Sequence, residues 1–154
     1  MGPSDREAPG ITPEVRRELA HWAKAAGVEL MVLFGSSVRP APDPPRDSAA
    51  ADGFSGRDVD LALDFPTLPS SRERLRIIGE LQDRVAPRRA DVVFLHRDTS
   101  PVLRFEVFRG GVPIFEGAAG TFAHEAFRAL ALYQDALPFR RLLRQRLRSG
   151  MESR

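Results

Sequence analysis

Two acidic residues, Asp58 and Asp60, have the type and spacing that phosphate chemistry needs. A strand would place both carboxylates on one face, roughly 6.5–7 Å apart at Cα. Carboxylates that close repel each other unless a proton or a cation relieves the repulsion. Carboxylate oxygens suit Mg²⁺, which often also binds the phosphates of a substrate. The pair therefore predicts a divalent-cation site, and the solvated face of an edge strand is the alternative.

A third carboxylate, Asp91, lies near the start of the later apolar segment Ala90–Leu95. If that segment pairs with the strand that carries Asp58 and Asp60, all three carboxylates can share one face and hold two Mg²⁺ ions. Two-metal sites serve in-line displacement at phosphorus, and Asp91 could also accept the proton of an attacking hydroxyl. An ordinary residue at the start of a strand is the alternative for Asp91.

A glycine–serine pair, Gly35-Ser36, directly follows the short apolar run Glu29–Phe34. Glycine lets the backbone turn sharply and approach a ligand closely. If a helix begins there, its free N–H groups suit a phosphate. Such pairs are also common as plain turns, so this one gains weight only beside the three carboxylates.

The elements that must position these residues alternate between helical and strand patterns. In chain order we expect a helix from Thr12-Pro13 to Gly27, a strand at Glu29–Phe34, a strand at Asp58–Phe65, a helix from Ser70 to Pro87, a strand at Ala90–Leu95, a helix from Ser100 to Gly110, an edge strand at Val112–Phe115, and a long last helix that Pro138 kinks or divides. This order predicts an α/β (α+β) fold, with a small mixed sheet and helices packed against it.

Apolar stripes at helical spacing indicate which helix faces meet the core. The first helix offers Val15, Leu19, Trp22 and Ala26; the second offers Leu75, Ile78, Leu81 and Val85; and the last offers Phe122, Ala126, Leu130, Tyr133 and Leu137.

The 154-residue length fits one domain. We expect a disordered N-terminus at 1–11, a catalytic domain at 12–117 with a flexible proline-rich insertion loop at 40–57, and a helical extension at 118–154. The last 17 residues, from Pro138, hold six arginines and one acid. That composition fits either a solvated helix face or the binding of phosphate or an acidic partner.

Composition excludes several classes of protein. The chain has no cysteine, which rules out a disulfide scaffold and thiolate metal sites and fits the reducing cytoplasm. The longest apolar runs are too short to span a bilayer, so we expect no membrane partner. The three histidines, His21, His96 and His124, share no metal-ligand spacing.

Four segments together resemble the minimal nucleotidyltransferases of the DNA polymerase β-like superfamily. They read LFGSSVR (Leu33–Arg39), GRDVDLALDF (Gly56–Phe65), ADVVFL (Ala90–Leu95) and RGGVPIFEG (Arg109–Gly117). The resemblance implies that Asp58, Asp60 and Asp91 are metal ligands and catalytic residues, and that Gly35, Ser36, Ser37 and Arg39 bind the nucleotide. Ser37 stands where many members have an arginine, and Arg39 matches their second arginine. The connection from Ser36 to Asp58 is also longer than is usual in the family.

The C-terminal segment AFRALALYQDALPFRRLLRQRL (Ala126–Leu147) is similar to the tail of antitoxins paired with HEPN-domain toxins. This similarity implies a Mg²⁺-dependent transfer of AMP from ATP to a tyrosine of a HEPN toxin. Two alternatives are a catalytically weak protein that neutralises its partner by binding, and a small-molecule nucleotidyltransferase of the antibiotic-modifying type. Nucleic-acid binding is a weaker alternative, because the arginine-rich tail has no interleaved aromatic residue beyond Phe139.

Overall fold

The structure, a computed structural model, describes residues 11–38 and 58–151, with side chains up to residue 146. The predicted disordered N-terminus (apart from Ile11, which packs on the core), the insertion loop at 40–57 and the nucleotide contact at Arg39 lie outside the described residues.

Four strands form one mixed sheet in the order β3-β2-β1-β4. The strands are β1 (Leu30–Phe34), β2 (Val59–Asp64), β3 (Ala90–Leu95) and β4 (Val112–Glu116). β1 is antiparallel to both β2 and β4, whereas β2 and β3 are parallel. The prediction of a small mixed sheet is confirmed, and β4, which contains Pro113, is an edge strand as expected.

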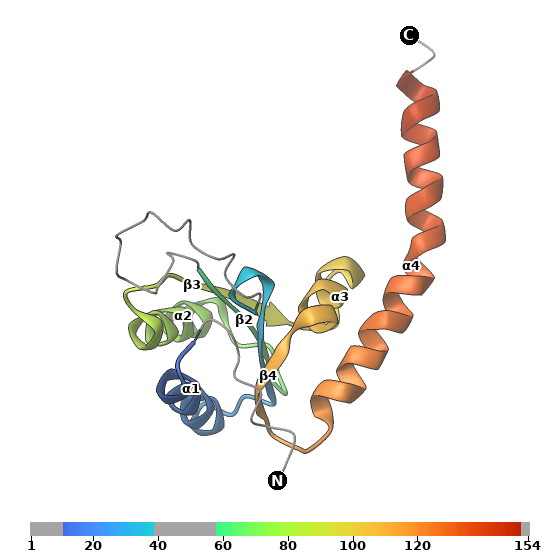
Figure 1. Cartoon of the computed structure of the whole chain (residues 1–154). Helices are drawn as coiled ribbons and strands as arrows, with labels where there is room; N and C mark the ends of the chain where they lie inside the picture. The colour runs from blue at the N-terminus through green and yellow to red at the C-terminus, as the bar shows by residue number, and fades with distance from the viewer. Residues whose placement is uncertain (1–10, 39–57, 152–154) are drawn as a thin grey trace, which may run out of the picture.

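Four helices cover both faces of this sheet (Figure 1). Helices α1 (Pro13–Ala25) and α2 (Ser71–Val85) pack on one face, and α3 (Pro101–Gly110) and α4 (Thr121–Met151) pack on the other. The predicted helix starts are confirmed, and each is capped: the hydroxyls of Thr12, Ser70 and Ser100 each accept a hydrogen bond from a backbone N–H of the first turn. A short 3₁₀ turn, η1 (Gly35–Val38), follows β1.

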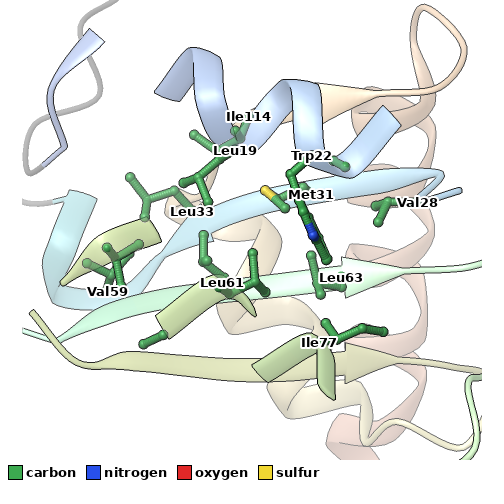
Figure 2. Packing of buried hydrophobic residues seen from close by; sticks show 14 residues of the cluster. Leu19, Trp22, Val28, Met31, Leu33, Val59, Leu61, Leu63, Ile77 and Ile114 are labelled. Carbon is green, nitrogen blue, oxygen red and sulfur yellow. The ribbon is translucent and has the colours of Figure 1, made fainter. Parts of the chain in front are cut away.

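The larger core lies between the sheet and helices α1 and α2, as Figure 2 shows. Strand residues that share one face fill it, together with Leu19 and Trp22 of α1. The stripe predicted for α2 is wrong at two positions: Ile77 is buried in place of Ile78, and Leu75 is 72% exposed. Ile77, Leu81 and Val85 also have helical spacing, so the pattern of α2 alone fits either face.

A second core lies between the sheet and helices α3 and α4. Its buried residues are Leu30, Val32, Ala62, Leu95, Val107, Phe108 and Ala129. In α4 the buried residue is Ala129, not Leu130, which is exposed. Because Ala62 lies on the same face of β2 as the acidic side chains, that face is not the solvated face of an edge strand.

A buried ion pair also joins α3 to α4. The Arg104 guanidinium lies 3.4 Å from Oε2 of Glu125 and donates a 2.6 Å hydrogen bond to the carbonyl of His96. Nearby, the rings of Phe105 and Tyr133 stack with centroids 4.2 Å apart. These contacts fix the first half of α4 to the domain.

The α4 helix continues through Pro138 instead of ending there. Of the two outcomes predicted at Pro138, a kink or a division, the division is wrong: the axis changes direction along its length, and the C-terminal half extends beyond the sheet (Figure 1). A proline removes one helical hydrogen bond and usually bends the helix. Among the residues that the structure describes, no helix has the length and apolarity to cross a membrane.

Candidate active site

The central carboxylate of the site is Asp60, on the middle of three adjacent strands. Asp60 pairs with Phe34 of β1 on one side and with Asp91 of β3 on the other. Residues paired in register point to the same face of a sheet, so Asp60 and Asp91 lie side by side on the face that α3 and α4 cover. The parallel pairing that brings these carboxylates together is present.

The electrostatics of Asp60 show that anionic charge is concentrated here. Burial raises the pKa of the Asp60 carboxyl, and the neighbouring charges of Asp91 and Asp58 raise it further. A hydrogen bond from the backbone N–H of Ser36 and the positive charge of Arg88 oppose that shift in pKa. The three predicted carboxylates therefore interact, and a bound cation would relieve their repulsion.

The glycine–serine turn is built around the same carboxylate. Gly35 has a φ of +69°, a left-handed conformation that favours glycine, and it sits at the end of β1 next to Asp60. This conformation turns the chain so that the Ser36 N–H donates to Asp60. Both residues are exposed, so the turn borders solvent beside the carboxylates.

The Ser37 side chain, by contrast, points inward. It is 2% exposed, and its hydroxyl donates a 2.8 Å hydrogen bond to the carbonyl of Phe34. The side chain therefore closes the turn from inside rather than facing a ligand. The Ser37 hydroxyl is therefore not exposed beside the carboxylates.

One basic residue beside the carboxylates, Arg88, was not among the predicted site residues. It precedes β3, and its charge acts on Asp60. The α2 residue Gln82 holds this segment from both sides, donating to the Arg88 carbonyl (2.7 Å) and accepting from the Ala90 N–H (2.9 Å). The signal in the sequence was the Arg88-Arg89 pair immediately before the segment that carries Asp91.

The donor set fits Mg²⁺ completed by a substrate. Within the described ranges, no three acidic or histidine side chains converge closely enough to hold an ion by themselves. Mg²⁺ usually takes only one or two protein carboxylates, with waters and substrate phosphates as its other ligands. Neighbouring carboxylates beside an exposed turn match that requirement.

Two polar residues at the other end of these strands, Asp64 and His96, lie away from the site. Asp64 is four residues farther along β2, about 13 Å from Asp60. Burial raises the pKa of Asp64, and the charge of Glu125 adds to the shift. His96 follows the far end of β3, where its Nδ1 accepts a hydrogen bond from the Asp98 N–H. Neither side chain therefore belongs to the group around Asp60.

The sequence of this chain matches a known protein family. The polymerase beta nucleotidyltransferase family matches residues 18–119, which contain the glycine–serine turn and all three carboxylates. The chain belongs to this nucleotidyltransferase family. No curated protein matches its sequence.

The fold of this nucleotidyltransferase is shared with chains of solved toxin–antitoxin structures. A mutant MntA–HpeT complex gives a TM-score of 0.67 at 16% identity, covering 86% of this chain and 97% of the other. A tri-AMPylated Shewanella oneidensis HEPN toxin in complex with MNT antitoxin gives 0.65 at 17%, with coverages of 87% and 96%. A toxin–antitoxin structure with AMP-PNP gives 0.65 at 17%, with coverages of 86% and 97%. At these identities the likeness shows a common fold.

Proposed function

We propose that this nucleotidyltransferase transfers AMP from ATP to a tyrosine hydroxyl of a HEPN toxin and thereby acts as its antitoxin. The observation that carries the proposal is the in-register pair Asp60 and Asp91 beside the exposed Gly35-Ser36 turn. Further support comes from the fold neighbours, one solved with AMP-PNP and another with an AMPylated HEPN toxin. ATP as substrate and the cysteine-free composition support a place in the cytoplasm.

The reaction is a displacement at the α-phosphorus of ATP. The acceptor oxygen forms a bond to the α-phosphorus, the bond from that phosphorus to the bridging oxygen breaks, and pyrophosphate leaves. In this scheme Asp91 would accept the hydroxyl proton, and its in-register position beside Asp60 supports that role. Catalysis then rests on positioning of the two substrates and on charge compensation.

Each side chain of the site has a separate task in this scheme. Asp58 and Asp60 would hold Mg²⁺, with Asp91 as a third carboxylate. Bound Mg²⁺ supplies charge neutralisation at the triphosphate. The backbone at Gly35-Ser36 borders the phosphates, and Arg88 adds a positive charge on the other side of Asp60. Ser37 supports the turn from inside.

The product of the gene next to this one, which the proposal requires to be a HEPN-domain protein, serves as the acceptor in the test. With ATP and Mg²⁺ we expect that protein to gain the mass of one or more AMP units on a tyrosine. The double variant Asp58→Asn, Asp60→Asn should show no gain while keeping its far-UV circular dichroism. Asp64→Asn is the matched control, because it makes the same change on the same strand away from the site. It should keep full activity.

Two results would contradict the proposal. Full transfer by the double variant would remove the carboxylates from the mechanism. No AMP on any tyrosine of the HEPN protein, with the intact chain still blocking its toxicity, would favour neutralisation by binding alone.

A further inference from the structure

The C-terminal part of α4 carries an exposed apolar stripe. It comprises Leu132, Phe139, Leu142 and Leu143, which we call the α4 stripe. Relative to Leu132, the others lie seven, ten and eleven residues later, a spacing that places them on one side of a helix. Phe139 is 80% exposed and Leu143 is 62% exposed. Large apolar side chains gathered on one exposed face indicate an interaction surface.

Most of this stripe lies beyond the part of α4 that packs on its own domain. The inner face buries Ala129 against the sheet and stacks Tyr133 on Phe105. Beyond Pro138 the helix leaves the domain, and Figure 1 shows nothing of the described chain packed against this end. A helix that served only its own domain would be polar on its remaining faces. Packing within the described part of the chain therefore does not explain the α4 stripe.

The net charge along this part of α4 indicates the kind of partner. Residues 132–146 contain four arginines (Arg140, Arg141, Arg144 and Arg146) and one acidic residue, Asp135, so this part of the helix is net positive. A second copy of α4 laid along the stripe would bring its own arginines against these, and like charges repel. A protein surface with an apolar groove bordered by carboxylates complements both the leucines and the arginines. The apolar content of the stripe favours protein over RNA.

The stripe lies on the side of the molecule where the acceptor hydroxyl must arrive. The carboxylates face the side of the sheet that α3 and α4 cover, and Ala62, two residues after Asp60, packs in the same core as Ala129 of α4. A partner held along the free end of α4 is therefore on the carboxylate side. A partner on α1 or α2 would be on the opposite side of the sheet.

We propose that the α4 stripe is the docking site for the protein acceptor, which it binds through an acidic-rimmed apolar groove. This inference rests on the proposed function and adds the surface that selects the acceptor. Docking here gives binding energy remote from the reacting atoms, so its loss should raise the KM for the protein acceptor and leave the chemical step intact.

The test compares two double variants of exposed positions in the full chain. Phe139→Ser with Leu143→Ser removes the stripe, and Leu75→Ser with Leu68→Ser, outside α4, is the matched control. With the neighbouring HEPN protein as acceptor, we expect the stripe variant to raise its KM at least about tenfold, equivalent to about 1.4 kcal/mol of binding. The kcat should stay within about twofold, ATP binding by calorimetry should be unchanged, and the control should match the parent.

Other outcomes overturn the docking proposal. An unchanged KM in the stripe variant would show that the acceptor docks elsewhere. A parent dimer that becomes monomeric in the variant, with transfer unaffected, would assign the stripe to self-association. Binding of a single-stranded RNA that the variant loses, again with transfer unaffected, would assign it to nucleic acid. Absence of transfer by the parent is a different result, because it counts against the proposed function itself.

Discussion

A β-carbon on Gly35 would lie 2.5 Å from Oδ2 of Asp60. A β-carbon does not approach a non-bonded heavy atom that closely, so this position of the Asp60 carboxylate requires glycine at residue 35. The end of β1 and the start of β2 thus meet without an intervening side chain, and the Ser36 N–H reaches the carboxylate. The glycine of the turn is required by the aspartate on the neighbouring strand.

Replacing Gly35 by alanine should impair both folding and transfer. Its φ of +69° costs a non-glycine residue about 1–2 kcal/mol, and the added methyl displaces the Asp60 carboxylate. Gly27→Ala is the matched control, because Gly27 has a φ of +74° but its added methyl meets nothing within 4 Å. Urea unfolding should show similar losses of stability in both variants. Transfer should fall only in Gly35→Ala, and equal activities would contradict this account.

Removing the two hydrogen bonds that Gln82 makes to Arg88 and Ala90 should destabilise the start of β3. Gln82→Leu deletes hydrogen bonds to the Arg88 carbonyl and from the Ala90 N–H, at a cost of about 1–3 kcal/mol in unfolding free energy. Because Asp91 follows Ala90, the rate of transfer should also fall. Gln82→Glu keeps the acceptor for Ala90 but places a carboxylate oxygen against the Arg88 carbonyl, and two acceptors repel, so it should also lose stability and activity relative to the parent. Parent-like transfer by Gln82→Leu would show that Asp91 is held by the sheet alone.

Restoring the arginine that many family members carry at Ser37 should not improve this enzyme. The Ser37 side chain is buried, and its hydroxyl is bonded to Phe34, so a guanidinium would lose its hydration there. We expect Ser37→Ala to lose about 1 kcal/mol of stability and Ser37→Arg to lose more and to express poorly. Thermal melts of both variants check the order. A stable, more active Ser37→Arg would show that the turn can rearrange.

The pH dependence of stability should change in Asp64→Asn. Burial raises the folded-state pKa of Asp64 above its ordinary value of 3.8, so the folded state binds this proton more tightly than the unfolded state. The resulting penalty is absent below pH 3.8, grows as the pH rises through the folded-state pKa, and is complete above it. The variant should therefore be more stable than the parent at neutral pH, with an advantage that shrinks on acidification. Melting curves of both proteins from pH 7.5 downward measure this difference. A variant that is as stable as the parent or less stable at neutral pH would show that burying the charged Asp64 carboxylate does not destabilise the fold.

Local patterns were sufficient to predict most of the elements. The N-caps at Thr12, Ser70 and Ser100, the alternation from Val59 to Asp64 and the edge position of Pro113 all depend on short-range geometry. The carboxylates and the glycine–serine pair were recognisable as candidate site residues from their residue types and order. The family match at residues 18–119 includes all of them.

Features that depend on distant contacts were not predictable in the same way. The parallel register of Asp60 with Asp91 could be stated only as a condition, because no local signal fixes which strands pair. In α2, both Ile77 and Ile78 complete a helical stripe, and only packing against the sheet selects Ile77. The effect of the Arg88 charge on Asp60 was likewise not predictable, because it depends on how separate elements pack. The hydrogen bond from Gln82 of α2 to the Arg88 carbonyl is one such contact.

The pairing of Phe34 with Asp60 makes the length of the connection between η1 and β2 independent of the sheet. Both ends of the connection between η1 and β2 are set by that pairing, so residues added within the connection need not move the carboxylates. Lengthening such a connection costs only about 0.6 kcal/mol for each doubling, if the added residues are flexible. The positions of Gly35 and Asp60 relative to each other are therefore independent of how many residues the chain places between η1 and β2.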